Sequence, residues 1–154
     1  MSNYSPAAPP TLLAPEGLAA WRGFLRAHTE LTRELDAELV AAHGLPLTSY
    51  EVLLFVASAD GGRMRMSELA NCVLLSRSGL TRLVDRLARD GLIERVPCDA
   101  DARGWFAAIT EKGRHAFEHA RRTHLDGVRR LFVARFSEAE LRTLAELFGR
   151  LTAG

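Results

Sequence analysis

The sequence predicts a mainly α-helical fold with one small β-hairpin. Long segments near both ends of the chain repeat apolar residues every three or four positions, which is the period of an amphipathic helix. Two shorter helical segments lie between them and are followed by two β-prone runs separated by a turn-rich loop. With 154 residues, 47% of them hydrophobic, the chain is long enough to bury one ordinary core.

The first long helix is expected from Glu16 to about His43. Gly44 and Pro46 stop it, and Thr48 is expected to cap a second helix from Ser49 to about Ala59. Residues 1–15 are rich in proline, so we expect a disordered or loosely docked arm there. The positions that predict the first helix are Leu18, Trp21, Leu25, His28, Leu31, Leu35 and Leu39.

In the middle of the chain, Ser67 is expected to cap a short helix with Leu69, Ala70 and Val73 on its inner face. After a turn at Leu74 and Leu75, Ser76 caps a second helix, which Gly91 ends by adopting a left-handed conformation. This second helix has an apolar stripe and an opposite polar side. The stripe is Leu80, Leu83, Val84 and Leu87, and the polar side is Arg77, Ser78, Thr81, Arg82, Asp85 and Arg89.

A hairpin is expected directly after these helices. Its strands are Leu92 to Val96 and Trp105 to Ile109, and the loop between them, PCDADARG, carries Arg103. An amphipathic helix with outward arginines is by itself usually a solvated surface helix. Helix, turn, helix and hairpin in this order, however, are typical of the winged helix-turn-helix, whose second helix enters the major groove of DNA.

The end of the chain predicts two further helices. One runs from Glu111 to about Arg135, and Ser137 caps the last. The small middle module cannot cover the apolar stripes of the terminal helices, so a partner is required. We therefore expect a helical dimerisation region, residues 16–47 and 111–154, around a DNA-binding domain, residues 48–110. The last helix has Leu141, Leu144, Leu147, Phe148 and Leu151 on its apolar side.

Three motifs resemble the MarR family (multiple antibiotic resistance regulators) of bacteria and archaea. They are SELANCVLLSRSGLTRLVDRLARDGLIER, the segment DADARG and the segment ITEKGR, and LTSYEVLLFVA upstream is similar to the family's second helix. The resemblance spans about Leu18 to Leu151. It implies a homodimer whose first and last helices intertwine. One departure is at the hairpin tip, which usually reads Asp-Arg-Arg in the family but is Asp101-Ala102-Arg103 here.

The resemblance implies a transcriptional regulator, a repressor, that binds double-stranded DNA. We expect it to be cytoplasmic, because the sequence has neither a membrane-spanning run nor a secretory pattern. A two-fold dimer presents two recognition helices about one helical turn apart, so the operator should be an inverted repeat. The recognition helix would lie in the major groove and the hairpin, or wing, in the minor groove. The candidate DNA contacts are Ser78, Thr81 and Arg82 at base edges, Arg77 and Arg86 near phosphates, Arg103 held by Asp101 in the wing, and Ser67.

Composition and motif content argue against an architectural DNA protein, a membrane protein and an enzyme. A formal net charge of +1 excludes the global basic field of an architectural DNA protein. No run approaches the about 18 apolar residues of a membrane span, and no secretory pattern opens the chain, so no membrane partner is expected. No enzyme is expected either, because nucleophile elbow, phosphate loop and HExxH are missing. A winged helix that binds only protein is the alternative, but it would not need Ser78, Thr81 and Arg82 together with a wing arginine.

The resemblance also implies a small-molecule effector, bound in a crevice between the dimer helices and the DNA-binding module. Aromatic residues at helical spacing are, however, more often part of a core than ligand contacts. The candidate crevice residues are Trp21, Arg22, His28, His43, Tyr50 and Phe55.

No cofactor and no metal are expected. His115 and His119 lie four residues apart on one helix and, with His43, resemble the arrangement in zinc-sensing members of the family. Surface histidines are the favoured interpretation, because no carboxylate precedes His43 and no cysteine lies on the first helix. Of the two cysteines, Cys72 is expected to be buried, whereas Cys98 at the wing base is a candidate for exposure.

Overall fold

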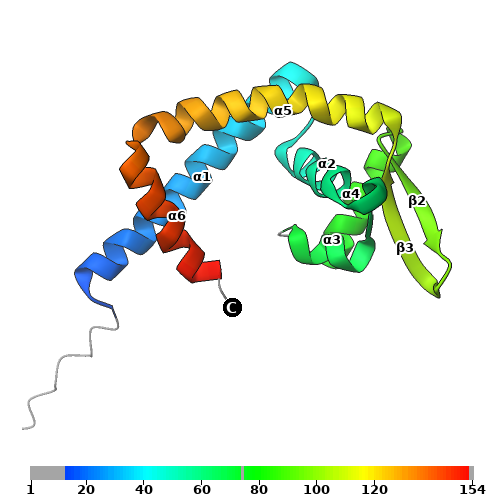
Figure 1. The fold of residues 1–154 in the computed structure, drawn as a ribbon, viewed down its shortest axis with the longest axis horizontal. Coiled ribbons are helices and arrows are strands. Elements are labelled where there is room, and N and C mark those ends of the chain that lie inside the picture. The colour runs from blue at the N-terminus through cyan, green and yellow to red at the C-terminus, as the bar shows by residue number, and fades with distance from the viewer. Residues whose placement is uncertain (1–12, 74, 153–154) are drawn as a thin grey trace, which may run out of the picture.

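The structure is a computed structural model that describes residues 13–73 and 75–152. Most of the expected N-terminal arm, residues 1–15, lies outside these residues. The mainly α fold with a hairpin is confirmed (Figure 1). The helices are α1 (Pro15–His43), α2 (Leu47–Ser58), α3 (Met66–Cys72), α4 (Arg77–Arg89), α5 (Glu111–Leu131) and α6 (Glu138–Thr152), the strands are β1 (Arg63–Arg65), β2 (Ile93–Cys98) and β3 (Asp101–Ile109), and 3₁₀ turns lie at Asp60–Gly62 and Val133–Arg135.

The long helix α5 joins two parts of the molecule (Figure 1). At its C-terminal end lie α6 and the N-terminal half of α1, and at its N-terminal end lie α2, α3, α4 and the hairpin. Among the described residues, no single helix has the length and apolar character needed to cross a membrane, although α1 and α2 taken together, which meet at an 83° bend, pass that test.

The predicted end of the first helix is confirmed, but the predicted cap of the second is wrong. Gly44 has a φ of 62° and donates its N–H to Val40 O at 2.8 Å. Helix α2 begins at Leu47, one residue before Thr48, and makes no cap hydrogen bond through its own N-cap side chain. The cap is supplied by α1 instead, because Asp36 Oδ1 accepts the Leu47 N–H at 2.8 Å.

Of the two predicted caps of the central helices, one is wrong and one is confirmed. The predicted Ser67 cap is wrong, because α3 begins at Met66 directly after β1 and Arg65 holds the N-cap position without a side-chain bond. Ser76 caps α4 as predicted, with its Oγ accepting the Gly79 N–H at 3.1 Å. Gly91 has a φ of 75° and ends the helix, also as predicted.

The hairpin belongs to a three-stranded antiparallel sheet of order β1-β3-β2. Strand β1 was not predicted; it pairs with β3 from Arg63–Ala108 to Arg65–Phe106. The hairpin strands are also longer than predicted, so Asp101 and Arg103 lie in β3 rather than in the loop. The wing is a two-stranded arm whose pairing is regular from Ile93–Ile109 to Pro97–Trp105 and then shifts register between Pro97 and Cys98, so that Cys98 pairs with Asp101.

The core lies between α1, α2, α4 and the start of α5. The predicted apolar stripe of α4 is buried, which confirms the orientation of that helix. Both cysteine expectations are wrong: Cys72 ends α3 at the protein surface and is exposed, whereas Cys98, the last residue of β2, is buried. The largest fully buried side chains include Leu39, Leu53, Leu69, Leu80, Leu87 and Ile93.

The two long helices cross at a glycine. A Cβ at Gly127 of α5 would lie 2.7 Å from Leu35 Cδ2 of α1, and Arg130 forms an ion pair with Glu38 beside this crossing. Helix α5 ends at Leu131, earlier than the predicted Arg135, because Phe132 leaves the helical conformation (φ −120°, ψ −64°).

The predicted Ser137 cap of the last helix is confirmed. Ser137 Oγ accepts the Glu140 N–H at 3.3 Å, and Glu140 Oε2 accepts the Ser137 N–H at 2.8 Å, which makes a reciprocal capping box. These hydrogen bonds from Ser137 hold the pKa of Glu140 below its ordinary value.

Candidate nucleic-acid interface

The outward face of α4 gathers the residues predicted to contact DNA. Ser78, Thr81 and Arg82 are all exposed, because the apolar stripe holds the opposite face of the helix in the core. Thr81 Oγ1 donates to Arg77 O at 2.9 Å, and Arg82 Nε lies 3.4 Å from Ser78 O. These side chains therefore lie together on one rigid helical surface of the width that a major groove admits.

This face is basic, although the whole chain is almost neutral. Arg77, Arg82, Arg86 and Arg89 stand against Asp85 as the one acidic residue within α4. The Asp85 carboxylate forms an ion pair with Arg95 of β2 at 3.2 Å. Because both partners are partly exposed, this pair contributes little stability, but it joins the recognition helix to the wing. Arg95 was not among the predicted site residues.

The predicted Ser67 lies beside this face. It is exposed on α3 and, with Arg77 and Thr81, borders a hollow of about 200 Å³ between α3 and α4. The structure therefore brings Ser67 together with the α4 residues, although it does not cap α3.

The wing carries the predicted Arg103 on β3, where it is exposed. The side chains of Asp101 and Ala102 lie outside the described residues, so the expected bond from Asp101 to Arg103 stays a prediction. Further along the sheet, the guanidinium groups of Arg63 and Arg65 lie 4.9 and 5.4 Å from the centre of the Phe106 ring. These two arginines were not predicted as site residues, because strand β1, which carries them, was not predicted. The alternating Arg-Met-Arg sequence after two glycines could have indicated this strand.

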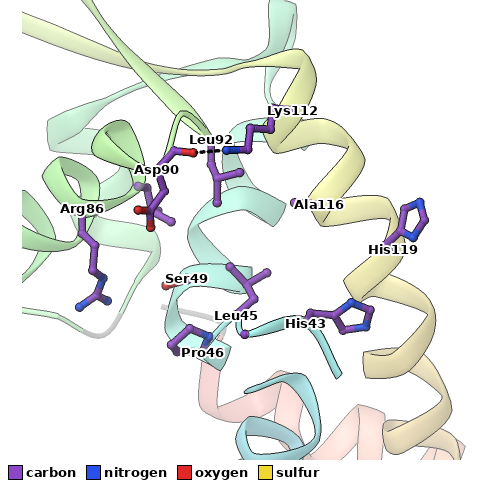
Figure 2. A pocket seen from close by; sticks show the side chains of 12 residues that line it. His43, Leu45, Pro46, Ser49, Arg86, Asp90, Leu92, Lys112, Ala116 and His119 are labelled. Carbon is purple, nitrogen blue, oxygen red and sulfur yellow. Dashed lines mark hydrogen bonds between the residues drawn. The ribbon is translucent and has the colours of Figure 1, made fainter. Parts of the chain in front are cut away.

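The candidate crevice residues do not line one common cavity. One cavity, of about 540 Å³, lies between the α1–α2 loop, helix α5 and the C-terminal end of α4, and His43 borders it (Figure 2). A second cavity, which we call the α2 cavity, has a volume of about 370 Å³ and is bordered by His28 and Phe55. Trp21 and Arg22 are exposed on the N-terminal half of α1, outside both cavities.

Tyr50 belongs to the core rather than to a cavity. It is 2% exposed, and its ring lies 5.6 Å from that of Phe117 and 4.6 Å from that of His124, measured between centroids. Burial raises the pKa of Tyr50 and lowers the pKa of His124. In the α2 cavity, burial raises the pKa of Glu51, an effect that His28 partly offsets.

The histidines considered for metal binding do not form a site. His115 and His119 are exposed on α5 and border different hollows. His43 Nε2 lies 2.7 Å from Thr123 Oγ1. Within residues 13–73 and 75–152, no group of three or more histidine, cysteine, aspartate and glutamate side chains is arranged to hold a metal ion.

Sequence comparison matches the central part of the chain to known regulators. Residues 43–104 match the profile of the MarR family. The transcriptional activatory protein BadR of Rhodopseudomonas palustris is 34% identical over 94 residues, 59% of this chain and 50% of BadR. The transcriptional repressor MprA of Escherichia coli K12 is 34% identical over 80 residues, 52% of this chain and 45% of MprA. The matched region of the chain thus spans about half the length of these curated relatives.

Solved structures extend the match to almost the whole chain. AbsC, a MarR family transcriptional regulator from Streptomyces coelicolor, is 31% identical with a TM-score of 0.84 over 91% of this chain and 94% of AbsC. Sco3205, a MarR family regulator from the same organism solved in complex with DNA, is 31% identical with a TM-score of 0.86 over 93% of this chain and 90% of Sco3205. These relatives are transcriptional regulators rather than enzymes, and the chain belongs to the MarR family of transcriptional regulators.

Proposed function

We propose that this regulator is a cytoplasmic homodimeric repressor that binds an inverted-repeat operator. The observation that carries the proposal is the outward face of α4, where Ser78, Thr81 and Arg82 are exposed on a helix whose other face is fixed in the core. The DNA complex of Sco3205 and the repressor MprA support it by analogy. Because the similar protein BadR is named as a transcriptional activatory protein, activation of transcription is the alternative to repression.

Sequence readout is assigned to the middle of that face. Arg82 suits a bidentate contact to guanine, and the Ser78 and Thr81 hydroxyls suit base edges of either kind. Arg77 and Arg86 lie nearer the borders of the face and are assigned to phosphates, which position the helix without reading sequence. Arg103 is assigned to the minor groove beside the wing.

The dimer is proposed from the apolar surface that α1 and α6 leave uncovered. Phe24 and Phe148 bring the two helices together, with ring centroids 6.1 Å apart. Around this contact, Trp21 is 54% and Leu151 75% exposed. A second copy that covers this surface would relate two α4 helices by a two-fold axis. Residues 16–47 and 111–154 would then be the dimerisation region, and residues 48–110 the DNA-binding domain.

An effector site is proposed in the α2 cavity. Leu54, Phe55 and Val73 give it a mostly apolar lining, and His28 and Glu51 add polar groups. Because the cavity lies between α1, α2 and the end of α3, a small apolar ligand with one polar group would change how α3 and α4 sit against the rest of the protein. Such a ligand would release the operator if it fitted only the DNA-free arrangement.

The test of DNA readout is the equilibrium affinity of Arg82→Ala for two DNAs. One DNA is the site enriched by the wild-type protein from random-sequence duplexes, and the other is an unselected duplex of equal length. We expect a loss of about 1–3 kcal/mol on the enriched site and a much smaller loss on unselected DNA. Arg122→Ala, an exposed arginine on α5, is the matched control and should change neither affinity.

Two outcomes would contradict the proposal. Equal losses on both DNAs would show that Arg82 contacts only the backbone. If the wild-type protein enriched no DNA sequence at all, the winged helix that binds only protein would be the better account.

A further inference from the structure

The three residues that follow the recognition helix are held against the start of α5 by hydrogen bonds to their successive backbone carbonyls. Thr110 N–H donates to Leu92 O at 3.2 Å, and Thr110 Oγ1 donates to Gly91 O at 2.6 Å. Lys112 Nζ donates to Asp90 O at 2.8 Å (Figure 2). We call residues 90–92 and 110–113 the α4–α5 joint. Here the start of α5 is bonded to the three residues that directly follow α4.

We propose that Lys112 is a positioning residue for sequence-specific DNA binding, whose ammonium group fixes the recognition helix relative to α5. Lys112 is the only lysine in the sequence. Its side chain passes over Gly91, where a Cβ would lie 3.7 Å from Lys112 Cδ, and its charge lies at the C-terminal, electronegative end of α4. This is the end where a cation stabilises a helix.

Lys112 acts at a distance from the base-reading residues. Ser78 is twelve residues from Asp90, about 18 Å along the helix axis, and Arg82, the nearest of the three base-reading residues, is eight residues away, about 12 Å. An effect of Lys112 on base readout is therefore expected to pass through the position of α4. On the proposed function, α5 leads from the joint to the dimer contacts, so the joint sets how two recognition helices are spaced.

The experiment compares Lys112→Met, which keeps the apolar stem, with Lys112→Arg, which keeps the charge. Affinity for the enriched site and for unselected DNA is measured for each across a salt series. We expect Lys112→Met to lower the ratio of specific to non-specific affinity about two- to fivefold, as for the loss of one charge at a helix end. Lys112→Arg should restore most of the ratio. The salt slope should not change, because no phosphate contact is lost.

A second measurement needs no DNA. Gly91 N–H bonds Ala88 O and Leu92 N–H bonds Leu87 O at the end of α4. Hydrogen exchange at these two amides should be faster in Lys112→Met than in the wild-type protein or Lys112→Arg. Acetylation of the wild-type protein with acetic anhydride removes the charge of Lys112 without a mutation. Because Lys112→Arg has no lysine, the acetylated form of this variant measures the effect of acetylating the N-terminal amine alone.

The failure of this inference is distinguishable from failure of the proposed function. An unchanged affinity ratio together with unchanged amide exchange in Lys112→Met would overturn the positioning role. A salt slope lowered by about one would also overturn it, because Lys112 would then be a phosphate contact. If the wild-type protein showed no sequence preference, the proposed function would fail, and the exchange measurement would still decide whether Lys112 fixes the joint.

Discussion

Replacing Gly113 with alanine should strongly destabilise the protein, although alanine favours a helix. Gly113 lies in the first turn of α5, directly against the segment that follows α4. A Cβ at this position would lie 2.0 Å from Leu92 O and 2.9 Å from Leu92 C. Both are backbone atoms, so no side-chain rotation can relieve the overlap, and α5 must move away from Leu92.

The size of the effect follows from the contacts that this movement breaks. A shift of about 1 Å or more breaks the hydrogen bonds from Thr110 and Lys112 to the carbonyls of residues 90–92, each worth about 1 kcal/mol. Overpacking adds about 1–3 kcal/mol, and the better helix propensity of alanine returns about 1 kcal/mol. The free energy of unfolding should therefore fall by about 3–5 kcal/mol, a large part of the stability of an ordinary domain.

Urea denaturation at one fixed protein concentration measures this change, since a dimer's stability depends on concentration. Gly149→Ala is the matched control: Gly149 lies inside α6, and a Cβ there would meet no atom within 4 Å. We expect this control to be neutral or to stabilise by up to about 1 kcal/mol. If the two variants had the same stability within about 0.5 kcal/mol, the close approach at Gly113 would not limit the fold.

Three further predictions concern the wing, the last helix and the half-buried His124. Arg103→Ala should weaken operator binding and lower the salt slope by about one; an unchanged slope and affinity would show that the wing does not anchor the protein. Truncation after Phe136 removes α6, so it should give aggregated or unfolded protein, and a stable folded monomer would refute the proposed dimer. Burial lowers the pKa of His124, so the unfolded state binds a proton first as the pH falls below about 6.5, and stability should decrease from there downward. When the free energy of unfolding is measured at a series of pH values, His124→Phe should remove part of this decrease, and the control His119→Ala, at an exposed histidine, should not. An equal decrease in the wild-type protein and His124→Phe would show that His124 does not cause it.

Local signals were enough to predict part of the fold. Ser76 and Gly91 bound α4 as predicted, because a serine N-cap and a left-handed glycine depend on neighbouring residues only. The Thr48 cap was wrong because Asp36, eleven residues before Leu47, takes over that role across a helix contact. Strand β1 was missed because three residues carry too little periodicity, and the strand forms only by pairing with the distant β3.

The candidate site was predictable to the same extent. The exposed face of α4 follows from helical periodicity, so the exposure of Ser78, Thr81 and Arg82 on one side of the helix was predicted from the sequence, whereas their contacts with DNA stay a prediction. The ion pair between Asp85 and Arg95 was not, because it depends on how the hairpin packs against α4. The candidate crevice residues lie in two cavities, in the core and, for Trp21 and Arg22, on the exposed surface of α1. A cavity is bordered by several elements, and their spacing cannot be read from one helix.

In the proposed complex, two recognition helices related by a two-fold axis read one operator together. The most direct measurement is the affinity for the enriched site before and after insertion of about 5 base pairs between its half-sites, roughly half a turn of DNA. The insertion turns one half-site to the opposite face of the duplex, so we expect an affinity close to that for unselected DNA. If the inserted site were bound as tightly as the original, the two recognition helices would not read the operator together.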